Sequence, residues 1–489
     1  MSTSTLYGDV PLIMSNETTD RKILSVLDIK EDLVDQEIIV RAFAAVVRGK
    51  GKCAFLLLRS QIATIQAAAF VQDNKNEEQV NFVKYIRGIP VESLVEIVGK
   101  LVKTDRPVTS ATIQNFEIQV SECHCVSRAQ PTPVVVADCA RVTEEDDDDS
   151  GAQSKPADKS RPTVTQKLRL DNRVLDLRTV ANQGIFRIQS KIGQFFREYL
   201  YQHGFQEIHT PKLIPTASEG GANVFKVDYF KTFAYLAQSP QLYKQMAVVS
   251  GMPRVFEVGP VFRAENSFTH RHLTEFTGLD AEMEIKENYH EALEIFKDLL
   301  ATIFNRLLNE CRPEIEAVKS QFPSTDVVIN PVIINFKDAV KMLHDAGCQM
   351  DELQDLTSEL EKKLGDLVKE KYNTDFYILD KFPSSVRPFY TMPDPQDPNY
   401  SNSFDMFLRG EEIVSGAQRI HDSELLLKRA AELKVDLTPI QPYVDCFKYG
   451  APPHAGLGCG LDRMTFLFLG LKNVRRGSMF PRDPSRLTP

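Results

Sequence analysis

The sequence predicts an α+β protein in two parts: a small N-terminal β-barrel and a larger domain built on an antiparallel sheet. Three observations support this prediction. Short strand-like segments follow one another early in the chain. After a linker-like stretch, long helical and strand patterns alternate irregularly, without a regular βαβ series. The sequence has no Walker loop and no G-x-G-x-x-G motif, which argues against a parallel nucleotide-binding sheet.

Length and composition indicate a globular protein of several domains. A chain of 489 residues is too long for one hydrophobic core, and its 42% hydrophobic and 26% charged content is ordinary. No apolar run is long enough to span a membrane, and the N-terminus lacks the features of a signal peptide. Only Cys123 and Cys125 lie close together, with no second pair to complete a zinc site. We therefore expect reduced thiols, no membrane partner and a cytoplasmic location.

The first part of the chain divides into an extension and a barrel. Residues 1–36 are polar apart from a short amphipathic stretch, and we expect a weakly ordered extension. Residues 37–129 contain five short strand patterns and one helical pattern at 77–86, which favours a small β-barrel of the OB type. Periodicity alone leaves other small barrels open. The strands are expected at 38–43, 54–59, 62–67, 95–102 and 117–123.

Charge is distributed unevenly along the chain. The whole chain carries a net charge of −9, but residues 38–103 contain ten Lys and Arg against five Asp and Glu. A local basic surface of this kind is enough to bind phosphates. Much of the acidic excess lies elsewhere, including the run 144–149. That run belongs to a stretch rich in Pro, Ser and acids, so we expect a flexible linker at 130–165.

The segment 255–285 is the most informative part of the second domain, 166–489. It is predicted to form two extended segments, 255–265 and 272–285, joined by a polar loop. Alternation with period two gives the second segment one face made of His272, Phe276, Gly278, Asp280 and Glu282. An aromatic ring, a glycine and acids make a poor core but suit a ligand with a flat ring and a cation. Arg263 is well placed beside them to bind an anion.

Two further segments carry residues suited to phosphate chemistry. A hairpin over 403–419 is expected to bring Asp405 near Glu412 and Ser415, and paired carboxylates near a phosphate site are natural Mg²⁺ ligands. A cluster of glycines at 456–460 precedes Arg463 and an apolar helix. Clustered glycines let the backbone approach a ligand closely, and an arginine at a helix start suits an anion.

Together with the helix 187–201 and the strand 205–211, these segments closely resemble the three signature motifs of class II aminoacyl-tRNA synthetases. The form is that of aspartyl-tRNA synthetases of the eukaryotic and archaeal type, and residues 475–484 are typical of the aspartyl, asparaginyl and lysyl subgroup. The resemblance covers roughly residues 37–489. It implies a class II catalytic domain over 166–489, an anticodon-binding OB domain over 37–129, and a homodimer with Pro211 at its interface.

The resemblance also implies the reaction. L-Aspartate and ATP form aspartyl-adenylate, and aspartate is then transferred to the 3′ end of tRNA(Asp), a ligase step of protein biosynthesis. Arg263, Arg463 and Glu412 are the implied catalytic residues. The implied ATP-binding residues are Arg263, Glu265, Arg271, His272, Leu273, Phe276, Glu412, Gly460 and Arg463. Mg²⁺ is the implied cofactor, with Asp405, Glu412 and Ser415 as its ligands.

The remaining implied residues bind the amino acid and the anticodon. Those for aspartate are Ser218, Glu219, Gln241, Lys244, Asp280, Ser415 and Arg419. Asp280 receives the substrate ammonium, whereas Lys244 and Arg419 hold the side-chain carboxylate. Ser239 and Pro240 are expected to begin the helix that carries Gln241 and Lys244. Phe55, Gln66 and Glu117 are the implied anticodon-binding residues, although without the resemblance Phe55 is interpreted as barrel core.

Two alternatives remain open. The first is an asparaginyl-tRNA synthetase, which shares the fold and most motif residues. Thr277-Gly278-Leu279-Asp280 is the aspartyl form of the second motif and favours the aspartyl reading. The second is an inactive paralogue that acts as a binding module, although no motif arginine or metal carboxylate is missing. The sequence leaves open charging of tRNA(Asn) and association with other synthetases.

Overall fold

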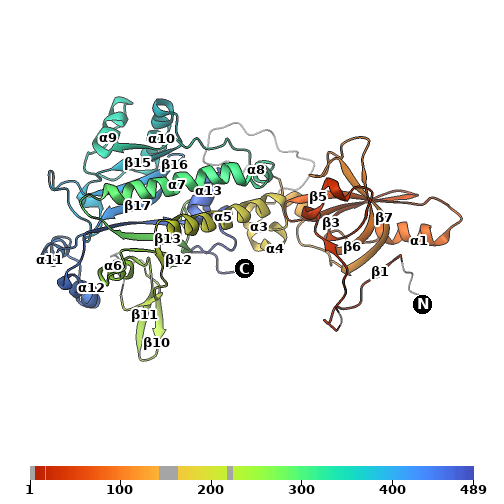
Figure 1. Ribbon diagram of the computed structural model, residues 1–489, viewed down its shortest axis with the longest axis horizontal. Helices are drawn as coiled ribbons and strands as arrows, with labels where there is room; N and C mark the ends of the chain where they lie inside the picture. The colour runs from red at the N-terminus through yellow and green to blue at the C-terminus, as the bar shows by residue number, and fades with distance from the viewer. Residues whose placement is uncertain (1–5, 17, 142–163, 217–223) are drawn as a thin grey trace. The chain divides into compact units, whose positions relative to one another are not determined.

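Figure 1 shows the computed structural model of the chain, which describes residues 6–16, 18–141, 164–216 and 224–489. The chain divides into two compact units, Met1–Gly184 and Ile185–Pro489. None of the helices in the described ranges combines the length and apolar character needed to cross a bilayer. The expected acid run and most of the expected linker, residues 142–163, lie outside the described residues. The described ends of that linker pack together, because Val134, Cys139 and Val164 form a buried cluster.

The first unit is a small β structure that contains the five expected strands, which are its longest, and the expected helix at 77–86, together with shorter strands and helices that were not expected. Pairing runs β3–β4, β4–β5, β5–β7, β7–β6 and β6–β3, so each long strand pairs with two others in a ring. This pattern fits the OB type. The elements are β1 (Tyr7–Asp9), β2 (Ile23–Leu24), η1 (Val26–Asp28), η2 (Glu31–Leu33), β3 (Glu37–Arg48), β4 (Cys53–Ser60), β5 (Ala63–Phe70), α1 (Glu77–Arg87), β6 (Leu94–Lys103), β7 (Phe116–Ser127), α2 (Val136–Cys139), α3 (Gln166–Asp171) and α4 (Arg173–Asp176).

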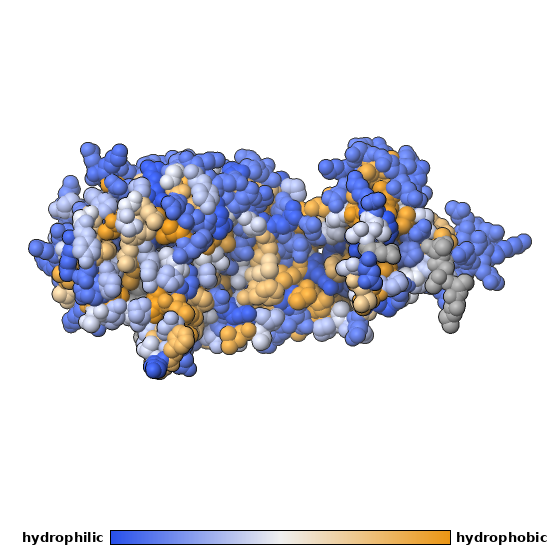
Figure 2. Space-filling view, turned by 60° about the horizontal axis from the view of Figure 1, so that its bottom comes forward, coloured by the Kyte–Doolittle hydropathy of each residue, from blue (hydrophilic) through white to orange (hydrophobic). Residues whose placement is uncertain are grey.

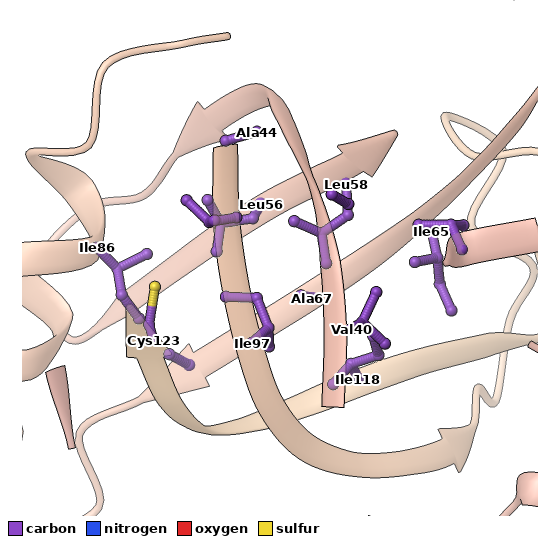
Figure 3. Close-up of a cluster of buried hydrophobic side chains, with 14 of the residues drawn as sticks. Val40, Ala44, Leu56, Leu58, Ile65, Ala67, Ile86, Ile97, Ile118 and Cys123 are labelled. Atoms are coloured by element: carbon purple, nitrogen blue, oxygen red, sulfur yellow. The ribbon is translucent and has the colours of Figure 1, made fainter. Parts of the chain in front are cut away.

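The N-terminal extension differs from the weakly ordered segment that was expected. Within its described residues, β1 pairs with β7 and β2 pairs with β3. Val26 and Ile29 are buried in the barrel core, because the amphipathic stretch supplies an apolar face that the barrel can cover. Figure 3 shows the centre of that core, with Leu56 and Leu58 from β4 pointing inward.

The second unit is built on an eight-stranded sheet of order β14-β15-β16-β17-β18-β13-β12-β8. The central pairs are antiparallel, as expected, whereas the pairs β14–β15 and β12–β8 at the two ends are parallel. A separate small sheet has the order β10-β11-β9. The strands of the second unit are β8 (Gln206–Glu207), β9 (Leu213–Ile214), β10 (Lys226–Tyr229), β11 (Thr232–Leu236), β12 (Arg254–Phe262), β13 (Glu275–Glu284), β14 (Val332–Asn335), β15 (Phe376–Asp380), β16 (Ser403–Leu408), β17 (Glu411–Gln418) and β18 (His454–Gly460).

Two long helices, α5 and α7, lie alongside each other against this sheet (Figure 1). Their inner faces carry fully buried residues at helical spacing, such as Ile188 and Phe196 in α5 and Phe296 and Ile303 in α7. The helices are α5 (Val180–Gln202), α6 (Gln241–Val249), α7 (His290–Glu310), α8 (Arg312–Lys319), α9 (Phe336–Asp345), α10 (Ser358–Tyr372), η4 (Ser384–Val386), α11 (Ser423–Glu432), η5 (Thr438–Ile440), α12 (Gln441–Cys446), η6 (Phe447–Tyr449), α13 (Leu461–Leu469) and α14 (Val474–Gly477).

Candidate active site

Three neighbouring strands form the floor of the site. In β13 and β18, Gly278 pairs with Gly460, Asp280 with Gly458 and Glu282 with Gly456. On the other side of β18, Ser415 of β17 pairs with Gly458. The glycines of β18 therefore separate the acidic face of β13 from the polar face of β17. The expected face of β13 is confirmed, except that His272 lies in the loop before the strand.

The glycines give the carboxylates of β13 room to lie over the next strand. A Cβ atom at Gly456 would lie 2.0 Å from Glu282 Oε2 and 2.4 Å from the carbonyl oxygen of Ala281. A Cβ atom at Gly458 would lie 3.2 Å from Asp280 Oδ1. A side chain at either position would occupy space that an acid now fills. This packing explains why glycine recurs at every second residue of β18.

A cavity of about 390 Å³ opens above this floor. All nine residues predicted to bind ATP line it: Arg263, Glu265, Arg271, His272, Leu273, Phe276, Glu412, Gly460 and Arg463. Four of the seven predicted for aspartate line it as well: Gln241, Asp280, Ser415 and Arg419. Segments more than 200 residues apart in the sequence thus meet at one surface.

One end of the cavity is aromatic and cationic. The Arg263 guanidinium lies 5.5 Å from the centre of the Phe276 ring. Gly460 lies between Phe276 and Arg463, since a Cβ atom there would be 3.7 Å from the Phe276 ring and 3.5 Å from Arg463 Cβ. A planar base and an anion can both be bound here, by stacking and by charge. Burial also lowers the pKa of His272, so this ring favours its neutral form.

At the other end of the cavity, the fully buried Glu282 holds Arg419 in place. Arg419 donates to Glu282 through Nε at 2.9 Å and Nη2 at 3.2 Å, and Glu282 has no exposed surface. Burial alone would raise the pKa of Glu282, but Arg419 and Lys244 hold it below its usual range. Glu282 thereby fixes the orientation of a guanidinium at the cavity wall, where it can receive a carboxylate.

Lys244 and the start of the helix that carries it differ from what was expected. Lys244 is buried behind the wall, where Nζ donates to Asp280 Oδ1 at 3.0 Å and to the carbonyl oxygen of Leu457 at 2.7 Å. The helix α6 begins at Gln241, one residue later than expected, although Ser239 Oγ still accepts from the Gln241 N–H. Ser218 and Glu219 lie outside the described residues.

The predicted metal ligands are neighbours on the hairpin β16–β17. Asp405 pairs with Ser415 across the two strands, and the two-residue turn Arg409-Gly410 has positive φ at both positions, as tight hairpins require. Glu412 and Ser415 line the cavity, whereas Asp405 is buried beneath it. Burial raises the pKa of Asp405, and the nearby charge of Glu412 raises it further, whereas Arg387 lowers it.

The oxygens of this hairpin fit a divalent cation held mainly by a substrate. Asp405 Oδ1 is buried and has no hydrogen-bond partner within the described residues. In the same part of the chain, no cluster of three or more His, Cys, Asp or Glu forms a ready metal cage. Two carboxylates and a hydroxyl are too few for a complete shell, but Mg²⁺ commonly takes one or two carboxylates and completes its shell with phosphate and water.

Sequence reasoning missed one acid that contacts a nucleotide residue, Glu361. Glu361 of α10 accepts a hydrogen bond from Arg271 at 2.8 Å, although the two lie 90 residues apart. Burial raises the pKa of Glu361 to about 7, against the opposing effect of Arg271. No local pattern marks Glu361, because it lies on an otherwise ordinary amphipathic helix.

The raised pKa of Glu361 predicts a pH-dependent stability. Because this pKa is higher in the folded protein than its ordinary value, the stabilisation is complete below pH 4.5 and is lost as the pH rises through about 7. We expect Glu361→Gln to remove up to roughly 3 kcal/mol of pH-dependent stability over that window. Thermal melts from pH 5 to 8 measure this, with the exposed Glu359→Gln of the same helix as control. Equal pH slopes for the wild type and Glu361→Gln would contradict the prediction.

The predicted anticodon residues form one outer surface of the first unit. Ala54 and Leu56 point into the barrel core, and Phe55 between them in the strand points outward. The interpretation of Phe55 as a core residue is therefore wrong. Gln66 accepts from Arg48 and donates to Glu117, each at 2.9 Å. The Arg48 guanidinium also lies 5.8 Å from the centre of the Phe55 ring. An aromatic face, a cation and paired polar groups are together suited to an unpaired base.

Comparison with known proteins agrees with this geometry. A family described as "tRNA synthetases class II (D, K and N)" matches residues 165–484. The chain belongs to this class of tRNA synthetases. The family match begins at residue 165, near the predicted boundary at 166, whereas the second compact unit begins at residue 185.

Individual relatives show which member of this class the chain resembles in sequence. The cytoplasmic aspartate–tRNA ligase of Mus musculus is 50% identical over 486 residues, covering 99% of this chain and 94% of the mouse protein. The structure resembles that of an aspartyl-tRNA synthetase of Entamoeba histolytica, with a TM-score of 0.89, 43% identity and coverage of 100% of this chain and 97% of that chain. An asparaginyl-tRNA synthetase of Pyrococcus horikoshii is 26% identical, with a TM-score of 0.78 and coverage of 95% and 99%. Within its class the chain therefore belongs to the aspartate–tRNA ligase family, and the asparaginyl alternative is wrong.

Proposed function

We propose that the cavity activates L-aspartate with ATP and that the protein then transfers aspartate to the 3′ end of tRNA(Asp). The observation that supports this most directly is the division of one cavity into two ends. One end offers an aromatic ring and arginines for a nucleotide, and the other offers Arg419 and Asp280 for an amino acid with an acidic side chain. The aspartate–tRNA ligase relatives support the same assignment.

The first step is an in-line displacement that needs no nucleophilic side chain. The α-carboxylate of aspartate attacks the α-phosphorus of ATP, a P–O bond forms, and pyrophosphate leaves with the electron pair of the bond that breaks. Arg263 binds the α-phosphate, and Arg271 and His272 contact the rest of the triphosphate. Phe276 and Arg463 hold the adenine between them. Catalysis then comes from positioning and charge stabilisation, as in other phosphoryl-group chemistry. In the second step a terminal ribose hydroxyl of the tRNA attacks the adenylate carbonyl and AMP leaves.

The aspartate end discriminates by charge, since aspartate and asparagine are nearly equal in size. A carboxylate only accepts hydrogen bonds, whereas an amide also presents N–H donors. Arg419 has only donors to offer, and Lys244 adds positive charge from behind the wall. Asp280 receives the substrate ammonium, with Gln241 beside it. An asparagine amide facing Arg419 would leave a buried cation unmatched, which is the costly case in recognition.

Asp405, Glu412 and Ser415 are the residues that would hold Mg²⁺ together with the phosphates of ATP. When bound, the ion neutralises phosphate charge and favours departure of pyrophosphate. Glu412 and Ser415 reach the cavity directly, and the carboxylate of Glu412 has no hydrogen bond or ion pair within the described ranges. It is therefore ready to accept a cation.

The outer surface of the barrel that carries Phe55, Gln66 and Glu117 is suited to bind the anticodon of the tRNA. We expect Phe55→Ala to lower kcat/KM for tRNA aminoacylation. The loss should correspond to roughly 1–3 kcal/mol of binding free energy, the usual contribution of one base stacked on an aromatic ring. Aspartate-dependent pyrophosphate exchange should stay unchanged, because Phe55 belongs to the unit without the cavity. The exposed Tyr449→Ala in the catalytic unit is the matched control. Normal charging by Phe55→Ala would contradict the anticodon role.

A homodimer is supported by apolar surface next to Pro211. Two residues further on, Leu213 is half exposed and its strand β9 pairs with β11, which carries the half-exposed Phe233. The hairpin β10–β11 also exposes Phe230 almost fully. Figure 2 shows that apolar residues gather in places on a surface that is otherwise largely hydrophilic. Contiguous exposed apolar residues mark interfaces, and light scattering on the purified protein measures the expected twofold mass.

The decisive assay is ATP–pyrophosphate exchange with each amino acid in turn. Exchange with aspartate alone supports the proposed function. Exchange with asparagine would support asparaginyl specificity, and absence of exchange with every amino acid would indicate a binding module. The relatives are named cytoplasmic, and the cytoplasm is the location that follows for this protein.

A further inference from the structure

Arg387 already occupies the place beside the metal ligands. Its Nη2 donates to Asp405 Oδ2 at 2.7 Å, and its Nη1 donates to Ser415 Oγ at 2.9 Å. These two partners are oxygens that the proposed function assigns to Mg²⁺. One guanidinium therefore bridges a carboxylate and a hydroxyl that are both among the residues that would hold the metal ion.

The position of Arg387 is well defined by its surroundings. Its backbone is extended, with φ −114° and ψ 150°, the conformation that the following Pro388 favours. Its guanidinium lies 4.1 Å from the centre of the Phe382 ring, so an aromatic face supports it from one side. Only 10% of the side chain is exposed, and it also lines the cavity. Arg387 is thus a built part of the site, and it can reach the nucleotide side.

Asp405 needs a positive partner whether or not a nucleotide is bound. Its side chain is 6% exposed, and removing the partner of a buried charge is strongly unfavourable. Its other oxygen, Oδ1, has no hydrogen-bond partner within the described residues. A guanidinium that satisfies only one oxygen leaves the second available to a cation that arrives with a substrate.

We propose that Arg387 is a resident cation that holds Asp405 and Ser415 in the nucleotide-free protein and is displaced when Mg²⁺ arrives with ATP. This inference rests on the proposed function, because it assumes that Asp405, Glu412 and Ser415 are the metal ligands. Arg387 lowers the affinity of the empty site for a free divalent cation, and ATP supplies the additional ligands needed for the exchange. The metal thereby binds together with its nucleotide and not before it. Arg387 acts as a positioning residue and takes no part in bond formation.

The test measures metal binding without nucleotide. Mn²⁺ is titrated into the full-length protein and free Mn²⁺ is followed by electron paramagnetic resonance. We expect Arg387→Met to bind Mn²⁺ at least about tenfold more tightly than the wild type, because the competing cation is gone. Arg387→Lys keeps a cation and should stay close to the wild type. The exposed Arg312→Met in α8 is the matched control for loss of an arginine.

A purely structural role gives a different result in thermal melts. We expect Arg387→Met to melt below the wild type without metal and to recover when Mn²⁺ or Mg²⁺ is added. The double variant Arg387→Met with Asp405→Asn should bind no extra metal and show no recovery. Unchanged or weaker Mn²⁺ binding by Arg387→Met, or a lowered melting temperature that metal does not restore, would overturn the proposal. Aspartate-dependent exchange by the wild type is measured in parallel, and its absence refutes the proposed function while leaving the nucleotide-free binding result intact.

Discussion

Replacing Arg419 by leucine is expected to reduce aspartate-dependent pyrophosphate exchange strongly. The loss of transition-state stabilisation should be at least roughly 2–5 kcal/mol, the range for truncating one partner of a buried charge pair. Arg419 lines the cavity and is held by two hydrogen bonds to Glu282. The substitution removes the donors that receive the aspartate side chain. It also leaves the fully buried Glu282 with Lys244, 3.5 Å away, as its closest remaining cation.

The loss of activity in Arg419→Leu can be assigned to aspartate binding only if the variant still binds ATP and still folds. ATP binding should change little, because Arg263 and Arg463 lie at the other end of the cavity. Arg312→Leu, an exposed arginine of α8, serves as the matched control for loss of charge. Glu282→Gln separates the loss of the Arg419 donors from the loss of the Glu282 ion pair, because it keeps the shape of the site and the guanidinium but weakens the hold on Arg419. Near-normal aspartate activation by Arg419→Leu would show that Arg419 does not bind the side-chain carboxylate.

Alanine at Gly456 is expected to disable the same end of the cavity without touching the substrate. The new Cβ atom would lie 2.0 Å from Glu282 Oε2 and 2.4 Å from a backbone carbonyl oxygen, and the strand pairings leave neither group free to move far. Overpacking of this kind typically costs about 1–3 kcal/mol, and occasionally more. We expect lower thermal stability together with weaker aspartate affinity, because Glu282 must move and Arg419 loses its support.

Gly193→Ala is the matched control for this prediction. Gly193 lies inside helix α5, and its added Cβ atom meets nothing closer than Arg197 Nη1 at 3.8 Å. Alanine is favoured over glycine inside a helix by roughly 0.5–1 kcal/mol, so this variant should be as stable as the wild type or slightly more so. If Gly456→Ala melts and binds aspartate like the wild type, the proposed packing of β18 under Glu282 is wrong.

The sequence by itself determined the α+β class and the order of the two units, because these depend on local patterns such as period two along β13 and helical spacing in α5. Through the resemblance to class II synthetases, it also indicated the nucleotide-binding part of the cavity wall. The nine predicted nucleotide residues all line the cavity, because they cluster in the segments 263–276 and 460–463 and at Glu412, whose strands pair directly or through one neighbour.

Only the tertiary structure decided which polar groups are partners of one another. Lys244 and Gln241 are neighbours on one helix, yet only Gln241 reaches the cavity, because the sheet beneath α6 presents Asp280 to Lys244. Arg387 meets Asp405 and Glu361 meets Arg271 across 18 and 90 residues, distances at which no periodicity carries information. Local patterns are set by the backbone repeat of a single element, whereas such pairs depend on the register and packing of separate elements, which only the folded chain brings together.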